Sequence, residues 1–184
     1  SRWWAWVCVV GVTAWATARV PSARPVRELL RNVASWPRRG PPVRFDDQSF
    51  DASYGRLYIV HMHANQLVVF DVEKREVVAN LDGFANVHGV LAVPELSRVY
   101  ASATGEHKVA VVDMQTLKII ATPGSIKYPD GIAYAPGPKR VFVSDEHGDA
   151  DAVIDGTTNS LVTQSPLGGG AGNTVYAGGS GHST

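Results

Sequence analysis

Histidine, aspartate and asparagine side chains gather in a few short polar segments of this 184-residue sequence. Imidazole and carboxylate groups can hydrogen-bond a polar ligand, move a proton or hold a divalent metal ion. The residues that we expect to bind a ligand are His61, His63, His88, His107, Asp130, Asp145, His147 and Asn173. If the ligand is a divalent metal such as calcium or zinc, the expected donors are Asp46, His88, Asp130 and Asn173. The elements that carry these residues decide which of them can meet.

Motifs that would identify a reaction are missing from the sequence. It contains no nucleophile elbow, no phosphate-binding loop and no cluster of Cys and His at zinc spacing. The glycine-rich run at 168–172 lacks the lysine and the following helix of a phosphate loop, so we interpret it as a link between strands. Enzymatic activity is therefore uncertain, and a binding role without catalysis is favoured.

A segment of sixteen residues occurs three times, at intervals of 42 residues. Residues 140–155 align without a gap on 98–113 and on 56–71. The three copies begin with Arg56, Arg98 and Arg140 and end with Asp71, Asp113 and Asp155. A fixed period of about 40–45 residues with four strands per unit is typical of a β-propeller blade.

Four β segments, which we call A to D, follow from the pattern of β-branched and aromatic residues between turns. In the middle unit they are 89–94, 98–104, 108–113 and 118–123. The first unit has 45–51, 56–62, 66–72 and 77–82, and the third has 131–136, 140–146, 151–155 and 160–167. A further A segment begins at Asn173. The predicted fold is all-β: three blades of four antiparallel strands plus one extra inner strand, which is a partial propeller.

The segment RVFVSDEHGDADAVIDGTTNSLV, residues 140–162, resembles the YVTN-type repeat of β-propeller proteins, and RVYASATGEHKVAVVDMQTLKIIAT, residues 98–122, resembles it almost as well. The resemblance covers residues 45–178 and implies the propeller fold. It implies less about function, since surface-layer, periplasmic and enzyme-associated proteins share such repeats. The asparagine that is usual after the aromatic-Val-Thr of the family is replaced by His61, Ala103 and Asp145.

The propeller arrangement sorts the polar residues by face. In a blade the B–C turn and the D–A link leave on one face, so we expect His61, His63, His88, His107 and His147 to share it. The segments at His88, Asp130 and Asn173 enter an A strand and are expected nearest the axis. Similar metal-centred funnels in gluconolactonase-like propellers imply an alternative function, a metal-dependent lactone hydrolase. The opposing interpretation is that Asp130 and His88, each followed by glycine, are turn residues that open a strand.

The repeated Arg and Asp residues have a structural interpretation. If segments B and C form a hairpin, Arg56 lies beside Asp71, Arg98 beside Asp113 and Arg140 beside Asp155. Each pair is expected to form a cross-strand ion pair, and each aspartate is expected to cap the turn after segment C.

The first 44 residues differ from the rest in charge and hydropathy. They carry eight arginines and one acid, whereas residues 45–184 carry nine basic and sixteen acidic residues. Residues 1–18 hold a sixteen-residue run without charge, which predicts a signal peptide or, alternatively, a membrane anchor. Residues 19–42 are predicted to be a basic spacer rich in Pro and Arg, and 43–184 the propeller repeats, with units at 55–96, 97–138 and 139–180.

The expected protein is periplasmic or secreted, or membrane-anchored if the leader stays, and the N-terminal segment is the only part expected to touch a membrane. It is expected to bind a protein or a small molecule on the histidine-bearing face. Nucleic acid is not an expected partner, because no basic stripe runs through the acidic repeats. An open arc of three blades would expose an apolar face at each end, and such faces promote association.

Overall fold

The structure is a computed structural model, and it describes residues 44–177. The predicted signal peptide or anchor at 1–18 and the spacer at 19–42 lie outside the described residues, as do 178–184. Within residues 44–177, no helix is long and apolar enough to cross a membrane.

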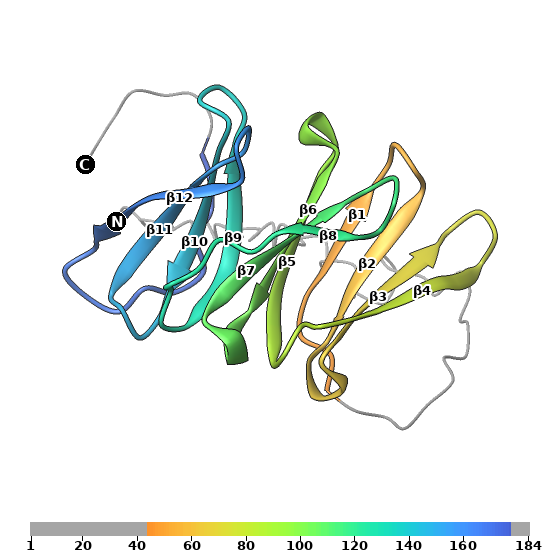
Figure 1. Cartoon of the computed structure of the whole chain (residues 1–184), viewed down its shortest axis with the longest axis horizontal. Helices are drawn as coiled ribbons and strands as arrows, with labels where there is room; N and C mark the ends of the chain where they lie inside the picture. The colour runs from red at the N-terminus through yellow and green to blue at the C-terminus, as the bar shows by residue number, and fades with distance from the viewer. Residues whose placement is uncertain (1–43, 178–184) are drawn as a thin grey trace, which may run out of the picture. The chain divides into compact units, whose positions relative to one another are not determined.

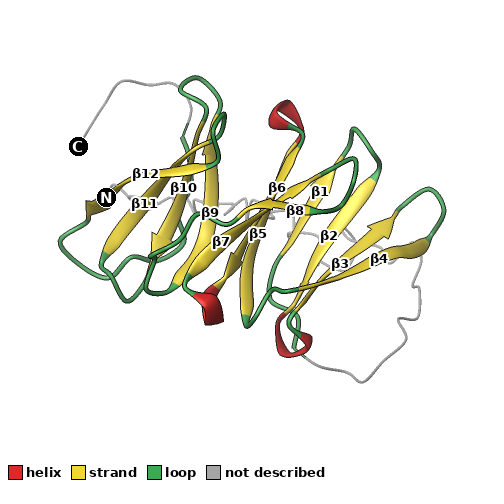
Figure 2. Cartoon of the chain, in the orientation of Figure 1, coloured by secondary structure: helices red, strands yellow, loops and turns green. Residues whose placement is uncertain are grey.

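Residues 44–177 form three antiparallel sheets of four strands each, which we call blades 1, 2 and 3 in chain order (Figures 1 and 2). Blade 1 contains β1 (Gln48–Asp51), β2 (Arg56–His61), β3 (Gln66–Asp71) and β4 (Glu76–Asp82). Blade 2 contains β5 (Val87–Val93), β6 (Arg98–Ala103), β7 (Lys108–Asp113) and β8 (Ile119–Ala121). Blade 3 contains β9 (Pro129–Ala135), β10 (Arg140–Asp145), β11 (Ala150–Asp155) and β12 (Ser160–Pro166).

The all-β propeller-type fold predicted from the repeat is confirmed, and the strands follow the predicted segments A to D. Three short 3-10 helices, η1 (Met62–Ala64), η2 (Pro94–Leu96) and η3 (Thr104–Glu106), lie in the turns, and residues 44–177 contain no α-helix. One detail differs from the prediction. Asn173 and Thr174 lie beside Gly131 of β9, but residues 173–177 are not a strand and form no ladder with a described strand.

The turns repeat as regularly as the strands. Left-handed backbone conformations occur at three positions of each unit: Gly55, Ser97 and Lys139; Asn65, His107 and Asp149; Arg75, Leu117 and Asn159. Most residue types pay about 1–2 kcal/mol for this conformation, and asparagine, aspartate and glycine adopt it most easily. Leu117 nevertheless adopts it, with φ of 56°. The hairpins therefore have the same turn geometry in all three units, whichever residue type stands at the turn position.

Successive blades are joined by rows of mostly apolar side chains, and each row runs across all four strands of a blade. We refer to these as apolar rows. We call the face of a blade that looks toward the next blade its front and the opposite face its back. The front row of blade 1 is Ser49, Tyr58, Val69 and Ala79, and the equivalent row of blade 2 is Leu91, Tyr100, Val111 and Ala121. The back row of blade 2 is Ala92, Val99, Val112 and Ile119, and that of blade 3 is Tyr134, Val141, Ile154 and Leu161.

The front row of each blade packs on the back row of the next. Tyr58 and Val69 share one buried cluster with Val99 and Val112. In the same way, the front row of blade 2 shares a second cluster with the back row of blade 3. Tyr58, Val69, Val99 and Val112 are all fully buried. Burial of large apolar side chains contributes about 1.5–3 kcal/mol each, so these two interfaces are the core of the domain.

The predicted ion pairs form in two blades out of three. The register places each arginine opposite its aspartate in all three hairpins. Arg98 pairs with Asp113 at 3.2 Å, and Arg140 pairs with Asp155. The prediction is wrong for blade 1, where Arg56 and Asp71 do not form a salt bridge and each has another partner.

The exception in blade 1 has a physical reason. Lys74 in the following turn lies 3.4 Å from the Asp71 carboxylate and supplies its cation, whereas the equivalent residues of the other blades are threonines. Arg56 instead donates to the carbonyl of Met114 in blade 2 at 2.6 Å and lies over the Tyr54 ring at 4.9 Å. Arg56 therefore links two blades instead of closing its own hairpin.

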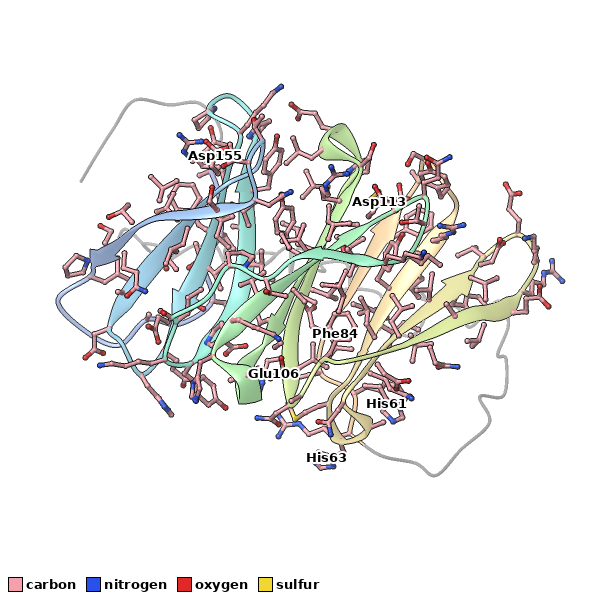
Figure 3. All side chains as sticks on the ribbon, in the orientation of Figure 1. His61, His63, Phe84, Glu106, Asp113 and Asp155 are labelled. Atoms are coloured by element: carbon pink, nitrogen blue, oxygen red, sulfur yellow. The ribbon has the colours of Figure 1, made fainter. Side chains whose placement is uncertain are left out.

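The three aspartates also cap the C–D turn, as predicted. The amide of the residue three positions later donates to each carboxylate, at 2.8 Å for Asp71 and Asp113 and at 3.0 Å for Asp155. These amide hydrogen bonds are the main reason that the pKa of each of the three carboxyls lies below its usual value. Asp113 and Asp155 lie at the same edge of the sheets, opposite the edge that carries His61, His63 and Glu106 (Figure 3).

We expect Ile154→Ala to lower the free energy of unfolding by about 2–5 kcal/mol, because it opens a cavity in the interface of blades 2 and 3. Ile120→Ala is the matched control, since the Ile120 side chain is 46% exposed whereas Ile154 is fully buried. The control should change stability by no more than about 0.5 kcal/mol. Urea unfolding measures both, and equal losses would contradict the packing of the two blades.

We expect the fold to lose stability as the pH falls below the usual carboxyl value of 3.8, through the lowered pKa values of Asp113 and Asp155. The folded state holds these groups ionised, so the stability is fully present above 3.8 and is lost as they become protonated. The double variant Asp113→Asn and Asp155→Asn cannot titrate there. Urea unfolding at a series of pH values should show that the difference in unfolding free energy between the wild type and the double variant shrinks in acid. A difference that stays constant with pH would show that Asp113 and Asp155 do not cause the acid loss.

Candidate functional site

A polar pocket of about 510 Å³ opens where β5 and β9 begin, beside the residues that precede β1. Pockets of roughly 300–1,000 Å³ are typical of small-molecule sites. Its charged and polar side chains come from Arg44, Asp46, Asp47, His88, Tyr128, Asp130, Glu146, Asn173 and Thr174. The pocket thus brings together the three residues predicted nearest the axis, His88, Asp130 and Asn173, and the fourth predicted metal donor, Asp46.

Glycine makes the close approach of the inner strands possible. A Cβ atom on Gly89 would lie 2.3 Å from the carbonyl oxygen of Asp130, and one on Gly131 would lie 2.9 Å from the side-chain oxygen of Asn173. The contact at Gly89 is with backbone and leaves no room for a side chain, and the one at Gly131 is tight. This close approach explains why the segments bearing His88, Asp130 and Asn173 meet.

His88 is held by hydrogen bonds on both ring nitrogens. Its Nδ1 lies 2.7 Å from the carbonyl oxygen of Asn86 and 2.9 Å from Oγ1 of Thr104. Because a carbonyl can only accept, Nδ1 carries a proton, and Nε2 is hydrogen-bonded to the hydroxyl of Tyr128 at 3.1 Å. His88 thus positions Tyr128.

Tyr128 joins two histidines at the wall of the pocket. Its ring centroid lies 5.3 Å from that of His88 and 4.2 Å from that of His147. Burial is the main cause that raises the pKa of the Tyr128 hydroxyl, and the carboxylates of Glu146 and Asp130 raise it further. Tyr128 therefore stays a neutral hydrogen-bonding group at ordinary pH.

The charge of the pocket is predominantly negative. Asp46, Asp47, Asp130 and Glu146 face a single arginine, Arg44, whose guanidinium lies 3.3 Å from Asp46. Burial raises the pKa of Asp130; His88 opposes this shift, while Glu146, Asp46 and Asp47 add to it. The contribution of three neighbouring carboxylates to the raised pKa of Asp130 reports negative potential, which favours a cation over an anion in the same space.

Two of the four residues predicted as metal donors are engaged by neighbouring groups in this arrangement. Both nitrogens of His88 are occupied by hydrogen bonds, and Asp46 is engaged by Arg44. Among residues 44–177, no group of three His, Cys, Asp or Glu is placed to hold a metal ion. The metal site stays a prediction.

The remaining predicted residues lie outside the pocket. His61 is 2% exposed and stacks on Phe45 with ring centroids 4.6 Å apart. His63 is exposed in η1, and His107 occupies a left-handed turn position with Nδ1 2.6 Å from the carbonyl oxygen of Lys127. His61 and His63 lie at the B–C edge of the sheets (Figure 3).

Asp145 is a buried residue that holds the chain segment next to the pocket in place through hydrogen bonds. It is 1% exposed and accepts from the backbone amides of Lys127, Tyr128 and Gly148 at 2.8–3.0 Å. Gly148 has to be glycine, since a Cβ there would lie 2.2 Å from the Asp145 carboxylate. Asp145 thereby fixes the link that carries Tyr128.

Five charged or polar pocket residues were not predicted as site residues: Arg44, Asp47, Tyr128, Glu146 and Thr174. Arg44, Asn86 and Tyr128 occupy the same position of successive 42-residue units, so the change of residue type at this position was the available signal. Thr174 corresponds to Val90 and Ile132. Only the folded chain shows that the five pocket residues face the same space.

No protein-family model matches the chain, and no curated protein sequence matches it either. Among solved structures, the chain is similar to Kuenenia stuttgartiensis hydrazine synthase, with a TM-score of 0.59 and 20% sequence identity. The similarity covers 64% of this chain and 34% of the hydrazine synthase chain. At this identity the likeness shows the fold alone, which is that of a β-propeller-type protein.

We expect Asp145→Asn to lower the free energy of unfolding by about 1–3 kcal/mol, because the amide group of asparagine would meet a backbone N–H where the carboxylate accepts. Asp149→Asn is the matched control, since Asp149 is exposed and its left-handed conformation suits asparagine. Thermal or urea unfolding compares the two. Equal stability of both variants would show that Asp145 is not a structural clamp.

Proposed function

We propose that this chain is a β-propeller repeat protein of the YVTN type that acts as a binding scaffold, with a small polar ligand held in the pocket at the start of β5 and β9. The observation that carries the proposal is the convergence of His88, Tyr128 and Asp130 on one cavity of about 510 Å³. The fold itself is compatible with a binding scaffold.

The chemistry of the walls supports a cationic ligand. The carboxylates of the pocket outnumber its one arginine, and that arginine is already engaged by Asp46. A ligand that brings an ammonium group or several N–H and O–H donors would compensate the partly buried charge of Asp130. An anionic ligand would meet the same carboxylates as like charges.

The export of the protein is a second part of the proposal. It is supported by the uncharged run within residues 1–18 that ends in Ala-Thr-Ala, the pattern of a signal peptide. A periplasmic or secreted location follows from cleavage, and a membrane-anchored one if the segment is retained.

The alternative function is a lactone hydrolase that uses a divalent metal. It rests on the four predicted donors lining one pocket, and it would require His88 to give up the hydrogen bond that joins it to Tyr128. Hydrolysis of gluconolactone that depends on added calcium or zinc, and that is lost in His88→Ala, would establish this alternative in place of the binding scaffold.

We expect isothermal titration calorimetry with ethanolamine and spermidine, at neutral pH, to show binding that gluconate does not show. Asp130→Asn should weaken that binding roughly tenfold or more, because it removes a charge-assisted hydrogen bond of about 1.5–3 kcal/mol. Since the pKa of Asp130 is raised, affinity should fall on acidification before ordinary carboxyls titrate.

Asp149→Asn serves as the matched control, because it removes the same charge from an exposed turn outside the pocket. It should bind both amines as the wild type does. If neither amine binds the wild type, or if Asp130→Asn binds them equally well, the assignment of the pocket to cationic ligands is wrong.

A further inference from the structure

The sequence contains three Asp-Gly pairs, and the fold holds them very differently. The pairs are Asp82–Gly83, Asp130–Gly131 and Asp155–Gly156. In such a pair the aspartate carboxyl can close a five-membered ring on the next amide nitrogen, and glycine has no Cβ atom to hinder the approach. Ring closure requires the peptide between the two residues to turn, so the hydrogen bonds of that peptide decide which pair can react.

The peptide of Asp130–Gly131 is held at both its oxygen and its nitrogen. The carbonyl oxygen of Asp130 accepts from the Ser102 hydroxyl at 2.5 Å, and the amide of Gly131 donates to the Ser144 hydroxyl at 2.9 Å. Neither residue of this pair is exposed. The nitrogen cannot turn toward the carboxyl carbon without breaking these bonds, so the fold protects this pair.

The peptide of Asp155–Gly156 is held in the same way. The carbonyl oxygen of Asp155 accepts from the Asn159 amide at 2.8 Å, and the amide of Gly156 donates to the carbonyl of Lys139 at 2.9 Å. The carboxylate of Asp155 is fixed as well, because it caps the C–D turn and pairs with Arg140. Neither reacting group of this pair is free to move.

The pair Asp82–Gly83 lies at the end of β4, where the link to β5 begins, and both residues are exposed. Asp82 stands opposite Gln66 in the last step of the β3–β4 ladder. Within residues 44–177 the Gly83 amide has no hydrogen-bond partner, and the Asp82 carboxylate has one exposed hydrogen bond, from the Gln66 side chain at 2.9 Å. Exposed hydrogen bonds of this kind contribute little, so both reacting groups can approach each other.

We propose that Asp82–Gly83 is a site of spontaneous isomerisation to isoaspartate. The Gly83 nitrogen attacks Cγ of the neutral Asp82 carboxyl, a C–N bond forms, and the nitrogen proton leaves with the carboxyl hydroxyl as water. The resulting succinimide then takes up one water. Opening at the side-chain carbonyl restores aspartate, whereas opening at the main-chain carbonyl gives isoaspartate. The water that is released equals the water that is consumed, so no other reactant is needed.

Isoaspartate lengthens the link to β5 by one backbone atom. Phe84 is fully buried between blades 1 and 2, and its amide donates to the carbonyl of Asn65 at 3.3 Å. The added atom is therefore taken up before Phe84, at the Asp82–Gln66 step that ends the ladder. The blade contacts and the net charge are retained, since the side-chain carboxylate is replaced by a main-chain carboxylate.

Peptide mapping of the aged full chain tests the proposal, because trypsin places the three pairs on separate peptides, 76–98, 128–139 and 141–184. The folded protein is kept in warm, mildly acidic buffer, where more of each carboxyl is in the neutral form that reacts. Electron-transfer fragmentation then identifies isoaspartate in each peptide. Isoaspartate should form at Asp82 roughly tenfold faster, or more, than at Asp130 or Asp155, a factor that the loss of about one hydrogen bond accounts for.

Two controls separate the effect of the fold from that of the local sequence. In urea that unfolds the chain, the three pairs should react at similar rates, because each is Asp-Gly. Asp82→Glu keeps the charge but would have to close a six-membered ring, so it should show no isomer at position 82 while circular dichroism reports the same β fold. Equal rates at the three pairs in the folded protein, a preference for Asp82 that persists in urea, or an isomer at position 82 in Asp82→Glu would each overturn the proposal.

Discussion

The packing of one blade's front row on the back row of the next is the interaction on which the rest of this structure depends. A four-stranded sheet cannot bury both of its faces alone, so each blade is stable only against a neighbour. Tyr58 and Tyr100 sit at the centre of these contacts and are fully buried. The positions of the inner strands, the turns and the pocket all follow from how the blades stack.

The pocket is a consequence of that stacking combined with departures from the repeat. Stacking brings the starts of β5 and β9 so close that only glycine fits at position 89, and Asn173 lies as tightly against Gly131. The side chains next to these glycines are then forced toward a common space. His88 and Asp130 occupy the same position of successive 42-residue units but differ in residue type. The scaffold is periodic and the site is not, as expected when function is carried by individual residues on a shared fold.

Much of the fold could be predicted from the sequence, since a 42-residue period records the same physical requirement three times. The register of the hairpins followed from Arg98, Asp113 and their equivalents. The absence of the Arg56–Asp71 ion pair in blade 1 could not be predicted. Lys74 binds Asp71 and the carbonyl of Met114 binds Arg56, and only the folded chain brings Met114 into reach. The pocket was partly predictable: His88 and Asp130 stood out at strand entries, whereas Tyr128 lacks any motif and acquires its place through Asp145.

The apolar rows of successive blades interlock in a fixed order, and nuclear Overhauser effects measure this directly. In a sample with labelled methyl groups, the Tyr58 ring should show effects to the methyls of Val99 and Val112, and the Tyr100 ring to those of Val141 and Ile154. Both sets should be present with similar intensity, since both interfaces bury equivalent positions. Effects from either tyrosine to methyls of its own blade alone, with none to the next blade, would contradict the account.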